Sequence, residues 1–427
     1  MYAPTIFAFA PVSFFRPEDR ALRLPFAQKT GITFRVATEC GSRSSGENIN
    51  GSRRNVLQLY DDRQTAVWMV KNPQGDALKN LVPLYGAASA NASIGNLNLQ
   101  STYNNLDDNV RGYQVLTGKY RENDMTLMAG VKVLNTHGRL SLDVYAPVKY
   151  VHISDVAMVD QTRADAVVAL ALARNNFVHD SITANLKQNL MQWGDLDISN
   201  WRKAGWGDLL VMLDWSKSYT MEMKDLVKEM TVGLRGGISC PTGIKKDVAQ
   251  ALSMAFGNDN AWAFPLGATM EFRLWRALKL GCSVDWLGIH DKRHIRRLKT
   301  DVNQTEFLLL NKGLAMKHYG ATWNLEPYAQ LFHIRDCFSA RIAYQYIAHN
   351  EDSLSVKSNS GFDNAIINTA HSLQPWRIHN MIFTINYDVA LTKDIYNIQC
   401  SAFYKLPLKG KGVIDTQTIG GQLAVNF

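Results

Sequence analysis

The sequence contains no run of apolar residues that approaches the roughly 20 needed for a membrane-spanning helix. This absence excludes a helical membrane protein, although 46% of the residues are hydrophobic. It does not exclude membrane-spanning strands, because each of these needs only about ten residues and exposes apolar groups at alternate positions. At 427 residues the chain is long enough for several soluble domains or for one large closed barrel.

Cysteine is also scarce: the chain has five, and none stands in a CxxC pair or near a histidine at metal-ligand spacing. The pattern favours neither a disulfide framework nor a zinc site, and we expect small buried or lipid-facing side chains instead. A Walker loop, a dinucleotide-binding glycine fingerprint and an HExxH helix are missing too. Accordingly, no catalytic residue, metal or cofactor is predicted.

Positive charge exceeds negative charge by eight, but the basic residues are scattered along the chain rather than clustered on one segment. This distribution argues against a nucleic-acid-binding protein. The densest group of cations lies at 292–299 and is predicted to be a solvated loop or strand end. Two functional alternatives for this group are contacts with anionic lipopolysaccharide and an anion-binding site at the mouth of a pore.

The end of the chain alternates in polarity and stops on an aromatic residue. Strand side chains point alternately to two faces, so every second residue shares a face. One face carries Ile419, Gly421, Leu423, Val425 and Phe427. The opposite face carries Gly420, Gln422, Ala424 and Asn426. The first face suits lipid, and the second suits water.

This closing strand resembles the last strand of bacterial outer-membrane β-barrels. The resemblance implies that the barrel assembly machinery recognises a sorting signal made of Ile419, Leu423, Val425 and Phe427. The alternative is an ordinary last strand of a soluble sheet. If the barrel interpretation is correct, the same alternation must recur along the chain.

Similar alternation does recur, and it predicts about fourteen antiparallel strands, with a range of about twelve to sixteen. Short connections such as 135–138 and 409–412, and long ones such as 351–375, predict one rim of tight turns and one rim of long loops. The predicted strands are 31–40, 109–120, 125–133, 139–146, 207–217, 230–239, 268–274, 278–288, 294–310, 317–333, 338–346, 380–391, 396–406 and 416–427.

Other regions depart from this pattern. Residues 160–203 place apolar side chains at helical spacing and predict one or two amphipathic helices, which either cap the rim or fold into the lumen as a lid. Residues 1–30 and 41–100 are rich in Gly, Ser, Asn and Pro and predict an N-terminal plug or long loops. Residues 1–15 are apolar and are either part of an export signal or a hydrophobic segment of the mature chain.

A wide barrel needs an interior that is either filled or wet. Charges of both signs fall on the polar faces of the predicted strands, and opposed charges would orient polar solutes in a pore. The alternative is a lumen filled by ion pairs, without an open channel. The predicted pore-lining residues are Lys132, Arg139, Asp143, Arg235, Glu271, Arg273, Glu326, Arg341, Asp388 and Lys405.

Segments 205–215 and 233–243 are similar to adjacent strands of the fourteen-stranded fatty-acid and aromatic-hydrocarbon transporters of the outer membrane. That similarity implies a hydrophobic substrate. However, the Asn-Pro-Ala signature of the long-chain fatty-acid transporters is missing near the N-terminus. Surface proteases with a barrel architecture need paired Asp-Asp and Asp-His groups. The adjacent residues His290 and Asp291 are interpreted as ordinary polar residues of a loop.

The sequence thus predicts a single all-β domain over 1–427, an antiparallel transmembrane β-barrel of a Gram-negative outer membrane. Its predicted function is a porin or channel for passive or facilitated diffusion of small solutes. A transporter for hydrophobic compounds and a closed structural or adhesion barrel are the alternatives. No enzymatic activity is predicted, and the expected partners are outer-membrane lipid, lipopolysaccharide, the barrel assembly machinery and small solutes.

Overall fold

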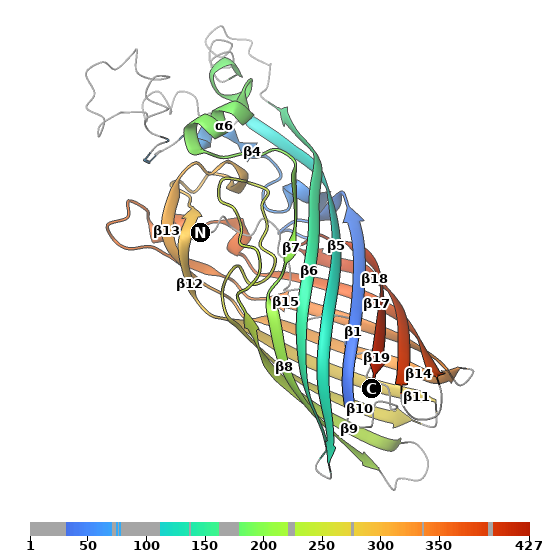
Figure 1. Ribbon diagram of the computed structural model, residues 1–427. Coiled ribbons are helices and arrows are strands. Elements are labelled where there is room, and N and C mark those ends of the chain that lie inside the picture. Colours follow the sequence, from blue (N-terminus) through green and yellow to red (C-terminus); the bar gives the residue numbers. More distant parts are fainter. Residues whose placement is uncertain are drawn as a thin grey trace, which may run out of the picture.

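The computed structural model describes residues 31–70, 74–75, 77, 112–135, 138–161, 179–220, 227–274, 277–334, 337–391 and 396–427. Its main feature is a closed ring of twelve antiparallel strands, so the predicted all-β antiparallel barrel is confirmed (Figure 1). The ring strands are β1 (Gly31–Arg43), β5 (Tyr113–Asn135), β6 (Gly138–Asp160), β8 (Leu209–Thr220), β9 (Val227–Cys240), β10 (Ala263–Leu274), β11 (Leu278–Ile289), β14 (Thr322–Ile334), β15 (Phe338–His349), β17 (Trp376–Leu391), β18 (Tyr396–Lys411) and β19 (Gln417–Asn426).

The ring closes where its first and last strands meet. β1 pairs with β19 from Thr33↔Asn426 to Ser42↔Gln417, and β5 pairs with both β1 and β6. Two further strands, β4 (Gln64–Thr65) and β7 (Trp201–Trp206), only extend the sheet along β5 and β6. Because every ring strand has a partner on both sides, the ring presents no unpaired backbone edge.

Apolar side chains cover the outside of the ring, and polar side chains lie inside it. On β10, Leu266 is 53% exposed, whereas Glu271 is 7% exposed. On β19, Leu423 and Ile419 are exposed while Gln422 between them is buried, which is the alternation expected from the sequence. A water-soluble protein buries its apolar faces, so this inverted distribution suits a ring surrounded by lipid.

The strand number differs from the central prediction of about fourteen, which is too high by two. Residues 113–120 of the predicted strand 109–120 and the whole predicted strand 125–133 belong to one continuous strand, β5, because the polar run 121–124 stays in register with β6 instead of turning. The predicted strand 294–310 is not part of the ring. Its first residues belong to β12 (Lys292–Arg297), which pairs with β13 (Lys312–His318) in a separate three-stranded sheet.

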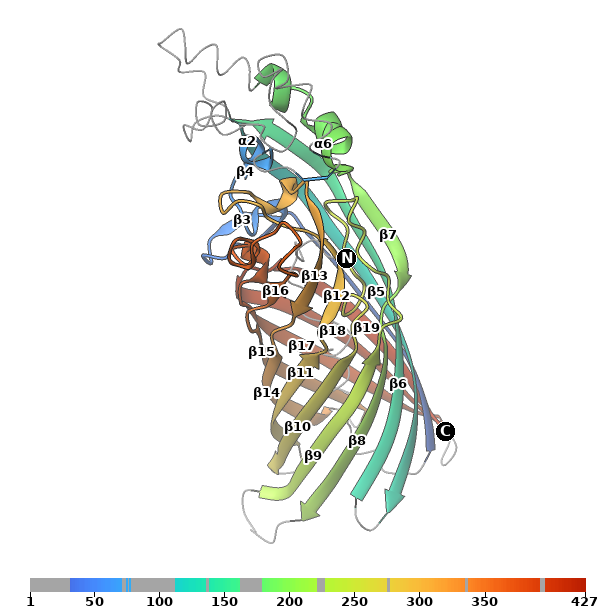
Figure 2. The ribbon, with the colours of Figure 1, turned by 90° about the vertical axis from the view of Figure 1, so that its left-hand side faces the viewer.

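Long connections gather at one end of the ring and short turns such as the one between β5 and β6 lie at the other, as predicted (Figure 2). The turn predicted at 409–412 is an exception. Residues 409–411 are the end of β18, and the N–H groups of Gly412 and Val413 bind the backbone of 47–48 at the end with the long connections. We call the described residues of the long connections the loop cap: 44–70, 179–208, 241–262, 290–321 and 350–375. Buried apolar residues that include Leu57, Leu190 and Phe307 form its core. Its further elements are β2 (Ser45–Glu47), β3 (Arg53–Asn55), η1 (Val56–Gln58), α2 (Ala66–Met69), η2 (His179–Thr183), α6 (Leu186–Gly194), η3 (Glu306–Leu308), β16 (Ser353–Ser355), α7 (Asn364–Ile367) and η4 (His371–Leu373).

The predicted helical insertion at 160–203 is represented by helix α6, while residues 162–178 lie outside the described residues. Leu186, Leu190 and Trp193 recur at helical spacing and are buried in the core of the loop cap, so α6 belongs to that cap. The proposed plug within 1–30 and most of 71–111 also lie outside the described residues, and the single-domain assignment stays a prediction. No described helix has the length and apolar character needed to cross a membrane.

Candidate functional site

Charged side chains on the inside of the ring form ion pairs, between adjacent strands or between strands separated by one other strand. Arg341 on β15 donates to Glu326 on β14 at 2.5 Å, and each side chain is 2% exposed. Arg235 on β9 pairs with Asp285 on β11 at 3.0 Å, with side-chain exposures of 5% and 0%. Because a lone buried charge is costly, pairing is what allows these groups to lie so deep.

Aromatic contacts join the ion pairs into a larger network. The guanidinium of Arg341 lies 3.9 Å from the ring centroid of Tyr328. Tyr328 donates its hydroxyl to Glu271, which also accepts a hydrogen bond from Lys279 at 2.9 Å. The network therefore ties β10, β11, β14 and β15 together and fills part of the ring interior with polar groups.

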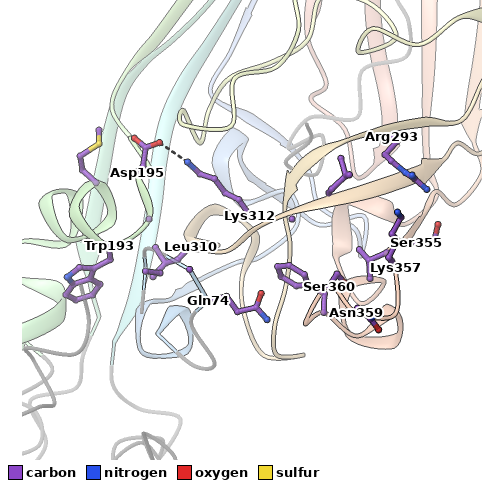
Figure 3. Close-up of a pocket in the computed structure, with 18 of the residues that line it drawn as sticks. Gln74, Trp193, Asp195, Arg293, Leu310, Lys312, Ser355, Lys357, Asn359 and Ser360 are labelled. Carbon is purple, nitrogen blue, oxygen red and sulfur yellow. Dashed lines mark hydrogen bonds and ion pairs between the residues drawn. The ribbon is translucent and has the colours of Figure 1, made fainter. Parts of the chain in front are cut away.

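A second feature is a pocket of about 780 Å³ in the loop cap (Figure 3). Its walls come from the C-terminal end of α6, from β12 and β13, and from residues 355–362. Its cationic residues are Arg293, Lys312 and Lys357, and its apolar residues include Leu310, Leu314 and Phe362. The pocket thus combines positive charge with apolar surface, and its volume is typical of a site for a small molecule.

The three-stranded sheet of β12, β13 and β16 contributes part of the lining of this pocket. Met316 on β13 is paired with Arg293 on β12 and with Ser355 on β16, so the three residues form one row across the sheet. Lys312 lies farther along the same face and binds Asp195, just beyond α6, at 2.7 Å. The end of α6 consequently covers one end of this face and leaves the row at Arg293 open.

Arg297 on β12 holds the walls of the pocket together. It is 2% exposed, and its five N–H donors all bind backbone carbonyl oxygens. Burial lowers the pKa of Arg297 to about 10, so the guanidinium stays charged at neutral pH. The acceptors belong to three separate connections of the loop cap: Val248, Leu309, Leu310, Gly194 and Asp195.

The basic run 292–299 is therefore not a solvated segment, and that prediction is wrong for most of its cations. Arg296, Arg297 and Lys299 are buried, whereas Arg293 is exposed at the pocket wall. Strand alternation and the packing of α6 decide which cation meets water. Neither is visible in a local count of charges.

Beside the pocket, Asp291, His318 and Ser355 form a hydrogen-bonded chain. Asp291 Oδ2 lies 2.6 Å from His318 Nδ1, and His318 Nε2 lies 3.0 Å from Ser355 Oγ. This order is that of a hydrolytic triad. However, the N–H of Val356, next to Ser355, donates to Asn364 Oδ1 at 2.9 Å and does not face an oxyanion position. We therefore infer that the hydrogen bonds between Asp291 and His318 and between His318 and Ser355 hold the Ser355 side chain in position.

The described residues contain no group of three or more His, Cys, Asp or Glu side chains that could hold a metal ion. Their polar chemistry is instead that of ion pairs and hydrogen bonds, both inside the ring and in the loop cap.

No protein-family model matches the chain, and no curated protein matches it. Among solved structures, the COG4313 outer membrane channel from Pseudomonas putida F1 aligns over 94% of this chain and 97% of its own, with 12% identity and a TM-score of 0.52. The likeness to this structure shows the fold, an antiparallel β-barrel of the outer-membrane kind. A Pseudomonas aeruginosa FadL homologue aligns over 100% and 95%, with 9% identity and a TM-score of 0.31. The NanC porin aligns over 74% and 98%, with 11% identity and a TM-score of 0.28.

In this β-barrel fold, the residues predicted to line a pore all occupy inward positions along their strands. Several are partners in ion pairs, including Lys405, which binds Glu39 at 2.6 Å. Their partners Glu39, Lys279 and Asp285 were not predicted to line the pore, although each lies in a predicted strand. Extending the period of two through those strands identifies them as inward as well.

Proposed function

We propose that the protein is an outer-membrane channel for small polar solutes. The observation that carries this proposal is the closed ring with an apolar outside and a charged inside. A polar solute that crosses the membrane through a narrow pore loses part of its hydration shell, and polar side chains on the pore wall must replace those contacts. Rows of positive and negative side chains inside the ring provide such contacts. In this arrangement the short turns face the periplasm and the loop cap faces the outside.

Buried ion pairs make the proposed path narrow. Arg341 and Glu326 are almost inaccessible to water, and so are Arg235 and Asp285. These residues lie on one continuous arc of the ring, from β9 to β15, and we propose that they narrow the channel there. We therefore expect small unitary currents and no passage of large solutes.

The same ion pairs favour a second candidate, a closed structural barrel. If the pairs stay in place at all times, the interior carries no continuous water path. This candidate predicts a correctly folded protein that never conducts. A transporter for hydrophobic compounds is the less favoured alternative, because the described interior at the ion pairs is polar rather than apolar.

Conductance of the refolded protein in a planar bilayer tests the proposal, with a heat-modifiability gel as the control for folding. We expect stable openings of the wild type and larger openings of the double variant Glu326→Ala with Arg341→Ala. Both partners are replaced so that no buried charge is left alone. The matched control is Glu229→Ala with Arg273→Ala, an inward pair at 3.3 Å whose side chains are already 27% and 34% exposed.

Larger openings in the first double variant and little change in the control would support the proposed constriction. Folded, heat-modifiable protein without openings in any of the three forms would contradict the channel and support the closed barrel. Equal enlargement in both variants would place the constriction elsewhere in the ring.

Membrane targeting is part of the same proposal. The outward residues Ile419, Leu423 and Phe427 are exposed on β19, and the Phe427 ring packs edge-on against Phe34 at 6.0 Å. We propose that these residues, together with Val425, form the signal for the barrel assembly machinery. Lipid and lipopolysaccharide are the proposed surroundings of the apolar exterior.

A further inference from the structure

We propose that the pocket in the loop cap binds a small organic anion, one that carries a carboxylate or phosphate group on an apolar body. Its charged group would meet the cationic end of the pocket, defined by Arg293 and Lys357. Its body would lie on the apolar wall, defined by Leu310, Leu314 and Phe362. This inference deepens the proposed channel function by adding a capture site for a class of solute.

The cationic end is built by the register of the small sheet. Arg293 and Ser355 flank Met316 in one row, which places their strands about 10 Å apart. Lys357 follows Ser355 by two residues and lines the same pocket. Figure 3 shows Arg293, Ser355 and Lys357 together at one end, away from Asp195 and Trp193. Two long cationic side chains can therefore reach one anionic group.

These two cations differ from the third cation of the pocket in their partners. Lys312 is neutralised by Asp195 at 2.7 Å. Among the described residues, no acidic side chain forms an ion pair with Arg293 or Lys357. The positive charge at this end of the pocket is consequently available to a ligand, and the ligand must be an anion.

The apolar wall excludes a bare inorganic ion as the best occupant. Leu310 is buried and Leu314 is 50% exposed, and Phe362 packs against the apolar cluster beneath the sheet. The volume of about 780 Å³ is far larger than one phosphate and fits an organic molecule. Burial of the apolar part on this wall adds to the charge attraction.

The pocket is also preorganised. Arg297 fixes Leu310 to the end of α6 through backbone hydrogen bonds, so two of the walls keep their spacing without a ligand. A site that is already shaped loses less entropy when it binds. The anion could be a free solute or the phosphate of a lipid headgroup, because both present the same chemistry to the two cations.

Isothermal titration of the full-length refolded protein with phenyl phosphate tests this proposal, with benzyl alcohol as the neutral counterpart. We expect saturable binding of phenyl phosphate, weaker binding at high salt, and no comparable binding of benzyl alcohol. In the double variant Arg293→Ala with Lys357→Ala, the dissociation constant is expected to rise about tenfold. The matched control is Arg202→Ala with Lys203→Ala, which removes two exposed cations outside the pocket.

Equal affinity of the wild type and the pocket variant would overturn the proposal, and so would equal binding of phenyl phosphate and benzyl alcohol. Heat modifiability confirms that each variant is folded. Titration in vesicles with and without lipopolysaccharide separates the two sources of the anion. Weaker phenyl phosphate binding when lipopolysaccharide is present indicates occupancy by a lipid phosphate, and unchanged binding indicates a free solute.

Binding and conductance fail independently of each other. A protein that binds phenyl phosphate but never conducts keeps the anion pocket and loses the channel. A protein that conducts but does not bind phenyl phosphate keeps the channel and loses the anion pocket.

Discussion

Replacing Arg297 by methionine is expected to loosen the loop cap while leaving the ring intact. The substitution keeps an apolar stem of similar length but removes the charge and all five N–H donors of a side chain that is 2% exposed. Five backbone carbonyl groups from three connections lose their partner at once. The ring does not depend on these bonds, because its strands pair with one another.

The magnitude follows from the geometry. The five distances run from 2.6 to 3.1 Å, and a hydrogen bond from a charged donor contributes about 1.5–3 kcal/mol. Water will enter and satisfy some of the carbonyl groups, and the five bonds do not act independently. We therefore expect the local stability of the loop cap to fall by about 3–5 kcal/mol, as when a buried charged partner is removed.

Hydrogen exchange measured by mass spectrometry can follow the cap and the ring separately in one sample. Faster exchange is expected at 194–197 and 306–311, with unchanged protection of ring strands such as β9 and β10. Arg293→Met is the matched control, since Arg293 lies on the same strand but is exposed. Unchanged exchange of the cap in Arg297→Met would refute the view that this side chain holds the walls of the pocket together.

Two further predictions concern the cap and the lipid-facing surface. The pKa of His371 is raised, mainly by its hydrogen bond to Asp61 at 3.1 Å, so this contact stabilises the cap fully below the ordinary pKa of 6.5 and is lost as the pH rises through the raised value. Because the side chain is 43% exposed, His371→Gln should lower the stability of the cap by less than about 1 kcal/mol at about pH 5.5, with almost no effect at about pH 8.5. A loss of protection against proteolysis that is the same at both pH values would contradict this assignment. Leu234 on β9 and Val302 in the loop cap are each 54% exposed, but only Leu234 would face lipid. Leu234→Lys should therefore lower the free energy of unfolding, measured by urea titration in liposomes, by about 2–4 kcal/mol, and Val302→Lys by less than about 0.5 kcal/mol. Equal losses in the two variants would argue against a lipid-facing ring.

Much of the ring could be predicted because strand alternation is a local property. In β10, for example, the order of Ala268, Met270 and Glu271 along the chain already assigns each to a face, and the structure agrees. The strand number was harder to predict. Polar residues at 121–124 look like a turn in sequence, but they lie within β5 because β6 continues to pair with them.

The sites depended on contacts that the sequence does not encode locally. Arg341 was predicted to face inward, but its burial against Glu326 depends on the register between β14 and β15. Arg293 and Arg297 are close in sequence and alike in chemistry. Packing of α6 over one end of β12 buries the second and leaves the first at an open pocket.

The sequence by itself determined that the chain forms antiparallel strands with one apolar and one polar face, because side chains repeat their direction every second residue. It also determined that charges of both signs face the inside of a barrel. Only the tertiary structure decided that twelve strands close the ring, which charges neutralise one another, and where the loop cap leaves Arg293 and Lys357 without an acidic partner among the described residues. Those outcomes depend on register and on packing between segments far apart in the chain, and a local pattern carries no information about either.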